Sequence, residues 1–130
     1  MTLPTNRTTA STPAEHVADH NTLHALHNGV TANRQTDSYT LVLTDESKVI
    51  EMNKATANNL TVPANSSVAF AVGTIIEIFQ YGAGQTTVVA GGGVTIRSSG
   101  GKLKLTGQYS GASLRKIATD EWCLVGDIAT

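Results

Sequence analysis

The sequence predicts a mainly β protein, an antiparallel β-sandwich or small barrel preceded by an N-terminal extended arm and one short helix. Composition is the first reason. Nineteen threonines and twelve glycines stand in a chain of which only 15% is charged, and threonine favours strands while glycine favours tight turns. The second reason is a series of short alternating segments, separated by turns, from residue 38 onward. The third is that the one helical pattern lies before that point.

One domain with an appendage accounts for the length of 130 residues, because typical domains have about 100–150 residues. We place an arm and helix for attachment or assembly in residues 1–37 and the β domain in residues 38–130. The single cysteine, Cys123, cannot form an internal disulfide bond. A core of this size folds without one.

Charge and hydropathy argue against two classes of partner. The net charge is −1, whereas a protein that binds nucleic acid carries an excess of basic residues to contact phosphates. No apolar run approaches the roughly 18 residues of a membrane helix, and the first residues do not form a signal peptide. We therefore expect synthesis in the cytoplasm and no nucleic-acid or membrane partner.

The first eleven residues are polar, with Leu3 as the single sizeable apolar side chain. Such a segment buries too little surface to order itself. It is either a frayed terminus or an arm that becomes ordered on the surface of a partner. In the second case the candidate contacts with the partner are Leu3, Pro4, Asn6 and Arg7.

A helix is predicted over residues 13–28. Thr12 and Glu15 form a capping box around Pro13, which suits the first helical position, and Gly29 provides the stop. With few large apolar residues this helix is marginal alone, so it must pack on its own domain, on a copy of itself or on another protein. The candidate oligomerisation or docking residues are His16, His20, Leu23, His24, Leu26 and His27.

The four histidines of this helix allow three interpretations. Their spacing would let two rings share a metal ion, or let rings stack across a symmetry axis and respond to pH. The third interpretation is ordinary half-buried packing. No carboxylate lies at the spacing of a metalloprotease site, so we favour packing and expect neither a metal nor a cofactor.

From residue 38 onward, short alternating segments predict eight or nine strands. Glycine-rich or polar turns separate them, no helical period interrupts them, and no repeat is clear enough to indicate a solenoid or propeller. In the most hydrophobic segment, Ile76, Ile78 and Gln80 face one way and Ile75, Glu77, Phe79 and Tyr81 the other. The predicted strands are residues 38–43, 48–52, 59–62, 74–81, 85–90, 94–97, 102–106, 113–118 and 122–125.

The residue pattern argues against an enzyme. The glycine runs lack the lysine and hydroxyl residue of a phosphate-binding loop, no serine lies in a nucleophile elbow, and residues 38–130 contain no histidine. Cys123 lies between Trp122 and Leu124, which indicates a buried and inert thiol.

Exposed aromatic side chains would allow stacking on a sugar. Most of the six aromatic residues are needed for the core of a small β domain. Tyr81 and Tyr109 lie beside glycine turns and are the candidate glycan contacts.

Two stretches carry a resemblance to bacteriophage proteins. Residues 13–24, Pro-Ala-Glu-His-Val-Ala-Asp-His-Asn-Thr-Leu-His, resemble a segment near the N-terminus of many small phage structural and minor tail proteins. Residues 73–88, with 107–110 and 122–127, are similar to a β module of phage tail fibres and head decoration proteins. These segments lie between residues 13 and 127 and together comprise 38 of the 130 residues.

The resemblance implies a structural protein on the surface of the virion. With the order of arm, helix and β domain, and without a long fibre shaft, it favours a capsid decoration (cement) protein that binds the outer head surface and stabilises it. The implied partners are the major capsid protein and two further copies in a homotrimer. The alternative is a tail-fibre or minor tail protein, with tail proteins as partners, or a glycan-binding receptor module.

Overall fold

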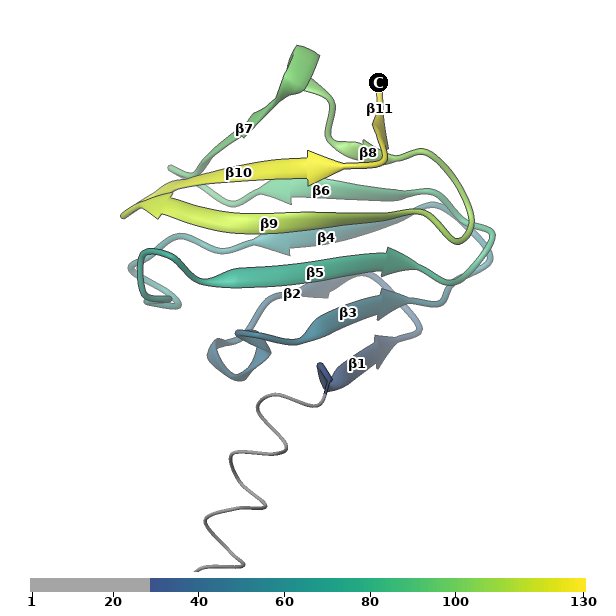
Figure 1. Cartoon of the computed structure of the whole chain (residues 1–130), viewed down its shortest axis with the longest axis horizontal. Coiled ribbons are helices and arrows are strands. Elements are labelled where there is room, and N and C mark those ends of the chain that lie inside the picture. Colours follow the sequence, from purple (N-terminus) through teal and green to yellow (C-terminus); the bar gives the residue numbers. More distant parts are fainter. Residues whose placement is uncertain (1–28) are drawn as a thin grey trace, which may run out of the picture. The chain divides into compact units, whose positions relative to one another are not determined.

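A computed structural model describes residues 29–130, of which Thr31–Thr130 form one compact β module. The predicted mainly β class is confirmed, with the strands arranged in two sheets (Figure 1). The module includes a strand, β1, that lies before the predicted boundary between residues 37 and 38. The predicted arm and helix in residues 1–28 lie outside the described residues. The strands are β1 (Ala32–Gln35), β2 (Tyr39–Thr40), β3 (Val49–Met52), β4 (Asn58–Val62), β5 (Ile75–Gln80), β6 (Thr86–Ala90), β7 (Thr95–Ser98), β8 (Lys104–Leu105), β9 (Gly111–Ala118), β10 (Glu121–Gly126) and β11 (Ile128–Ala129).

The chain crosses between the sheets after almost every strand. The six-stranded sheet has the order β1-β3-β5-β9-β10-β7, and the five-stranded sheet has the order β11-β8-β6-β4-β2. The first six strands therefore form three stacked coils, with one strand of each coil in each sheet. The hairpin of β9 and β10 then enters the six-stranded sheet between β5 and β7 (Figure 1).

The predicted antiparallel pairing is correct for only part of the module. Pairs β5–β9, β9–β10, β6–β8 and β8–β11 are antiparallel. Pairs β1–β3, β3–β5, β2–β4, β4–β6 and β7–β10 are parallel. Each full coil brings the chain back beside its previous turn in the same direction, and alternation of side chains along a strand is the same in both kinds of pair.

The coils contain different numbers of residues, so the structural repeat does not appear as a repeat in the sequence. Ala32 pairs with Val49, and Val49 pairs with Glu77 after a much longer excursion. A fixed period is the sequence signature of a solenoid, and no such period exists here.

Turns at one end of the coils stack directly on one another. The Gly82 and Gly84 amides donate to Met52 and Lys54 carbonyls at 3.0 and 2.9 Å. A Cβ atom on Gly84 would lie 1.9 Å from the Thr56 carbonyl oxygen. This turn joins β5 of one sheet to β6 of the other, and it requires glycine because the two backbones approach closely.

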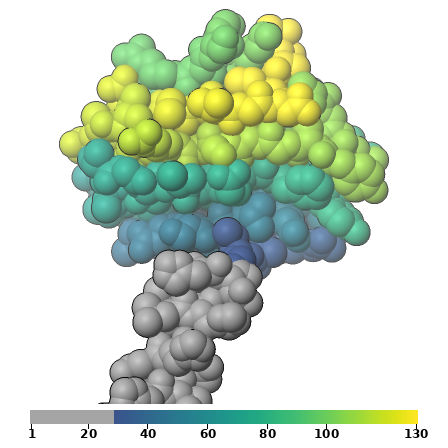
Figure 2. Space-filling view, viewed as in Figure 1, coloured from purple at the N-terminus to yellow at the C-terminus, as the bar shows by residue number. Residues whose placement is uncertain are grey.

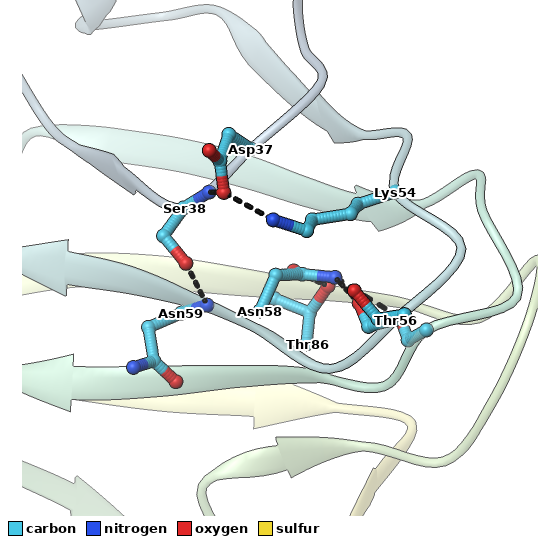
Figure 3. Close-up of polar contacts among 8 residues, drawn as sticks. Asp37, Ser38, Lys54, Thr56, Asn58, Asn59 and Thr86 are labelled. Carbon is cyan, nitrogen blue, oxygen red and sulfur yellow. Dashed lines mark hydrogen bonds and ion pairs between the residues drawn. The ribbon is translucent and has the colours of Figure 1, made fainter.

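Polar side chains connect the same turns (Figure 3). An ion pair joins Asp37 to Lys54, and the Asn59 amide donates to the Ser38 hydroxyl at 3.0 Å. Figure 3 also shows the buried Asn58, which accepts from the Thr86 hydroxyl at 2.7 Å. These contacts hold the first, second and third coils in register.

The core lies between the two sheets. The predicted alternation of β5 is confirmed, because Ile76, Ile78 and Gln80 are all buried whereas Ile75 is exposed. The predicted strand 38–43 is shorter than expected: only Tyr39–Thr40 is a strand, and a 3₁₀ turn at Leu43–Asp45 leaves Leu43 exposed. The buried apolar residues are Leu41, Ile50, Met52, Leu60, Val62, Phe70, Ile76, Ile78, Val88, Leu105, Ala112, Leu114, Trp122 and Leu124.

Candidate functional site

The structure brings together the two predicted glycan contacts. The rings of Tyr81 and Tyr109 lie edge to face, with centroids 6.1 Å apart. Both rings approach Phe79, at 6.4 and 6.3 Å. We call these three residues the aromatic cluster. The Tyr109 side chain is 64% exposed and that of Tyr81 is 39% exposed, so the cluster presents aromatic surface to solvent.

The other predicted site residues cannot be placed in the same way. The arm contacts and the helix residues all lie in residues 1–28, outside the described part of the chain. Those predictions stay open. The residues are Leu3, Pro4, Asn6, Arg7, His16, His20, Leu23, His24, Leu26 and His27.

A tight turn holds Tyr109 in an unusual backbone conformation. Its φ of 69° lies in the left-handed region that a tyrosine adopts only where its surroundings enforce it. The Tyr109 amide donates to the Gln80 carbonyl at 2.6 Å, and the Gln108 side chain donates to the Tyr81 carbonyl at 3.2 Å. The turn before β9 is thus fastened to the end of β5, which fixes both tyrosines relative to each other.

An arginine from the first coil covers one side of the cluster. The guanidinium carbon of Arg34 lies 3.9 Å from the centroid of the Tyr81 ring, close enough for a cation–π contact. Its Nε donates to Glu51 Oε1 at 3.0 Å. The register of β1 on β3 places Arg34 directly beside Glu51. The same register therefore positions Arg34 both for the ion pair and for the contact with the Tyr81 ring.

A shallow depression of about 420 Å³ lies beside the cluster on the outer face of the six-stranded sheet. Gly111 has no side chain and leaves its floor open, and Glu51 and Glu77 line it together with Phe79. The Ser113 hydroxyl donates to Glu77 Oε2 at 2.6 Å. We call this feature the sheet depression.

The chemistry of this site suits a flat, hydroxylated ligand. Aromatic faces offer stacking surface, and two carboxylates offer several acceptor positions for hydroxyl donors. Arg34, Glu51 and Glu77 together carry one net negative charge, which disfavours an anionic ligand. Within residues 29–130, no cluster of side chains could hold a metal ion, and no helix is long and apolar enough to span a bilayer.

The outer faces of the two sheets differ in character. Six of the nine exposed large apolar side chains in the described part of the chain lie on the six-stranded sheet or its adjoining turns, and none lies on a strand of the five-stranded sheet. Figure 2 shows the face of the six-stranded sheet. We call it the apolar face, and its six residues are Val72, Ile75, Tyr81, Tyr109, Ile117 and Val125.

Cys123 also faces outward on this sheet. It is half-buried and pairs with Arg115 and Arg97 in the neighbouring strands. The expectation of a fully buried thiol is therefore wrong, because Cys123 is out of phase with the inward residues Trp122 and Leu124.

Two titratable groups in the first coil have displaced pKa values. Burial, followed by the hydrogen bond that its hydroxyl donates to Asp45 at 2.8 Å, raises the pKa of Tyr39 above 10.0. The hydrogen bond from Lys54, followed by the Ser38 amide, lowers the pKa of Asp37 below 3.8. Asp45 is buried and also accepts from Asn33 and the Val42 amide, so this cluster ties β1 to β2.

Alternation predicted part of the site and missed the rest. It placed Glu77, Phe79 and Tyr81 on one side of β5, as observed. It gave no reason to connect them with Arg34, Glu51 or Gly111, because those contacts depend on which strands pair.

A scan against protein-family models and a search of curated protein sequences find no match to this chain.

Proposed function

We propose that the chain is a structural protein of the bacteriophage particle that decorates the outer surface of the capsid. The resemblance of residues 13–24 and of the β segments to phage proteins supports this proposal. In it, residues 1–30 attach the protein to the major capsid protein or assemble a homotrimer, and the β module, which includes β1, projects from the shell or clamps neighbouring subunits. The proposal includes no catalytic activity.

The observation that carries the proposal is the apolar face. Isolated apolar residues are common on protein surfaces. In the described part of the chain they lie on the strands of only one sheet, among the outward charged residues Arg34, Glu51, Glu77 and Arg115, and this uneven distribution between the two sheets supports an interaction surface there. Val125 and Ile117, on neighbouring strands, are 65% and 40% exposed. A rigid module with one such face fits a protein that binds between copies of a shell subunit.

The test mixes purified, undecorated heads with the protein. We expect saturable binding at a fixed ratio to the major capsid protein, weakened by Val125→Asp and unchanged by Thr87→Asp on the five-stranded sheet. Deletion of residues 1–11 should weaken attachment and leave the melting temperature of the β module unchanged. Absence of saturable binding to heads would end the proposal.

A second candidate function is a tail-associated, glycan-binding receptor module. The specific observation that favours it is the aromatic cluster beside the sheet depression. Carbohydrate stacking uses exposed aromatic faces, and the carboxylates of Glu51 and Glu77 supply acceptors for hydroxyl groups.

A glycan array distinguishes this candidate. We expect binding of neutral or amino-bearing glycans in preference to acidic ones, and loss of that binding in Tyr109→Ala. The matched control is Val72→Ala, which removes an exposed apolar side chain outside the aromatic cluster. Binding that survives in Tyr109→Ala and Tyr81→Ala would exclude the cluster as the glycan site.

A further inference from the structure

Lys116 occupies a position where the strand pattern calls for an apolar residue. It lies on the inward face of β9, in line with Ala112 and Leu114, and is 2% exposed. Its partner across the β9–β10 pair is the buried Trp122. Lysine is almost never buried this far without a compensating partner.

The amine of Lys116 is held by two neutral oxygens. Nζ donates to Asn65 Oδ1 at 2.6 Å and to the Phe70 carbonyl at 2.7 Å. Phe70 itself packs edge to face on Trp122, with ring centroids 5.5 Å apart. Among the residues that the structure describes, Lys116 has no ion-pair partner, so the buried amine faces a carboxamide in aromatic surroundings.

The same hydrogen bond places a nucleophile beside an electrophilic carbon. Nζ lies 2.6 Å from Asn65 Oδ1. Because a carbonyl oxygen is about 1.2 Å from its carbon, Nζ is at most about 3.8 Å from Asn65 Cγ. Reacting atoms in near-attack arrangements are about 3–3.5 Å apart, so a small shift suffices for attack.

We propose that Lys116 and Asn65 form an intramolecular isopeptide bond. The free amine of Lys116 attacks Asn65 Cγ, an Nζ–Cγ bond forms, and the Cγ–Nδ2 bond breaks. One proton passes from Nζ to Nδ2, which leaves as ammonia. The products are a secondary amide and ammonia, and the step needs no oxidant, reductant or further reactant.

In this proposal the proton is carried by Asp120, the acidic side chain that contacts Asn65 through its backbone amide. Its Oδ1 accepts from the Asn65 backbone amide at 2.8 Å, which also fixes the main chain of Asn65. Asp120 lies in the turn between β9 and β10, two residues after Ala118 ends the strand that bears Lys116. One hairpin therefore supplies both the nucleophile and the carboxyl group.

The bond would fasten β9 to the long connection between β4 and β5. That connection contains Asn65 and Phe70 and is the longest one between consecutive strands of the module. A covalent link between distant positions stabilises mainly by restricting the unfolded chain. Such a link suits an external component of a particle, although it does not depend on the proposed function.

The test is the intact mass of the purified full chain under denaturing conditions. We expect the wild-type protein to lack about 17 Da, the mass of ammonia, relative to its sequence. The variants Lys116→Met and Asn65→Ala should have their full sequence masses. The matched control Lys104→Met, which changes an exposed lysine on β8, should still lack the same mass.

A peptide map separates this bond from cyclisation of Asn65 onto the backbone of Ser66, which also releases ammonia. The isopeptide predicts one cross-linked peptide pair containing residues 65 and 116, and resistance of Lys116 to trypsin. Cyclisation predicts the mass loss in Lys116→Met as well. A full-mass wild-type protein, or a mass loss without the cross-linked pair, overturns the proposal.

Two further variants examine the roles of the groups. Asn65→Asp should form the same amide with loss of about 18 Da, the mass of water. Asp120→Asn keeps an acceptor for the Asn65 amide but carries no proton, so its mass loss should be much slower. Unchanged formation of the bond in Asp120→Asn would show that Asp120 takes no part in the reaction.

The loss of the cross-link should also lower thermal stability. The melting temperature of Lys116→Met should be at least roughly 10 °C below that of the wild type.

Discussion

The same three coils build both sheets, yet the outer faces of the two sheets carry different kinds of side chain. On the five-stranded sheet, neighbouring strands place Thr40 beside Thr61, Asn59 beside Thr87, and Thr87 beside Lys104. The six-stranded sheet exposes the apolar face, the aromatic cluster and the sheet depression. Threonine fits a solvated pleated surface, so it builds a sheet that needs no partner. Under the proposed function, this difference assigns recognition to the six-stranded sheet.

The largest expected effect comes from the turn that keeps the two sheets in place. Gly84→Ala should destabilise the module by about 3 kcal/mol or more, because the new methyl group would overlap the Thr56 backbone. Gly92→Ala is the matched control, since its Cβ would meet open space. Urea unfolding measures both. A Gly84→Ala variant as stable as the wild type would show that this turn does not hold the two sheets in place.

A smaller loss is expected where the first coil connects the edges of both sheets. Tyr39→Phe removes the hydroxyl that donates to the buried Asp45 and should cost roughly 1–2 kcal/mol. Chemical unfolding at neutral pH measures this loss. Thr40→Val, on the outward side of the same strand, should change stability by less than about 0.5 kcal/mol.

The displaced pKa of Tyr39 gives this contact a pH dependence. Because the folded protein raises that pKa above 10.0, the stabilisation is complete below pH 10.0 and declines as pH rises through the higher pKa of the folded state. Melting curves between pH 8 and 11 should show a steeper alkaline decline in the wild type than in Tyr39→Phe. Identical slopes would contradict the assignment.

The two faces should also differ in binding to the capsid. Val125→Asp should lower the amount of protein that cosediments with undecorated heads, because it places a charge on the apolar face, and should change stability by less than about 0.5 kcal/mol. Thr87→Asp on the other sheet should leave that amount unchanged. Equal effects of the two variants would remove the functional distinction between the faces.

The smallest effect concerns the exposed ion pair at the stacked turns. The pKa of Asp37 is below 3.8, so its contribution is present above pH 3.8 and is lost as pH falls through the lower pKa of the folded state. Asp37→Asn should lower the melting temperature only slightly at pH 7 and not at all near pH 2. A larger decrease in melting temperature in acid than at neutral pH would contradict the lowered pKa of Asp37.

Sequence patterns predicted local structure better than pairing. Alternation divided the residues of β5 correctly between its two faces, because successive side chains of a strand point to opposite sides. It missed β1, whose residues Ala-Asn-Arg-Gln include no large apolar side chain and form a strand through pairing with β3. The contact between Tyr81 and Tyr109 depends on the register of Phe79 with Gly111, which joins segments far apart in the sequence.

Lys116 shows what such patterns can still detect. The expected strand over residues 113–118 places Leu114 and Lys116 on one side, so a lysine on the core side was visible in principle. The residues that contact the Lys116 amine could not be predicted, because Asn65 and Phe70 lie in a connection without strand structure.

The position of the β9–β10 hairpin bears on how the protein is made. Until residues 111–126 leave the ribosome, β5 has no neighbour on one side and β7 has no partner in its sheet. The nascent chain can stack its coils but cannot complete the six-stranded sheet, to which the hairpin also contributes the core residues Trp122 and Leu124. Folding is therefore completed late, by the last long strands to emerge, and a chain cut before them would expose an open sheet edge to its neighbours on the polysome.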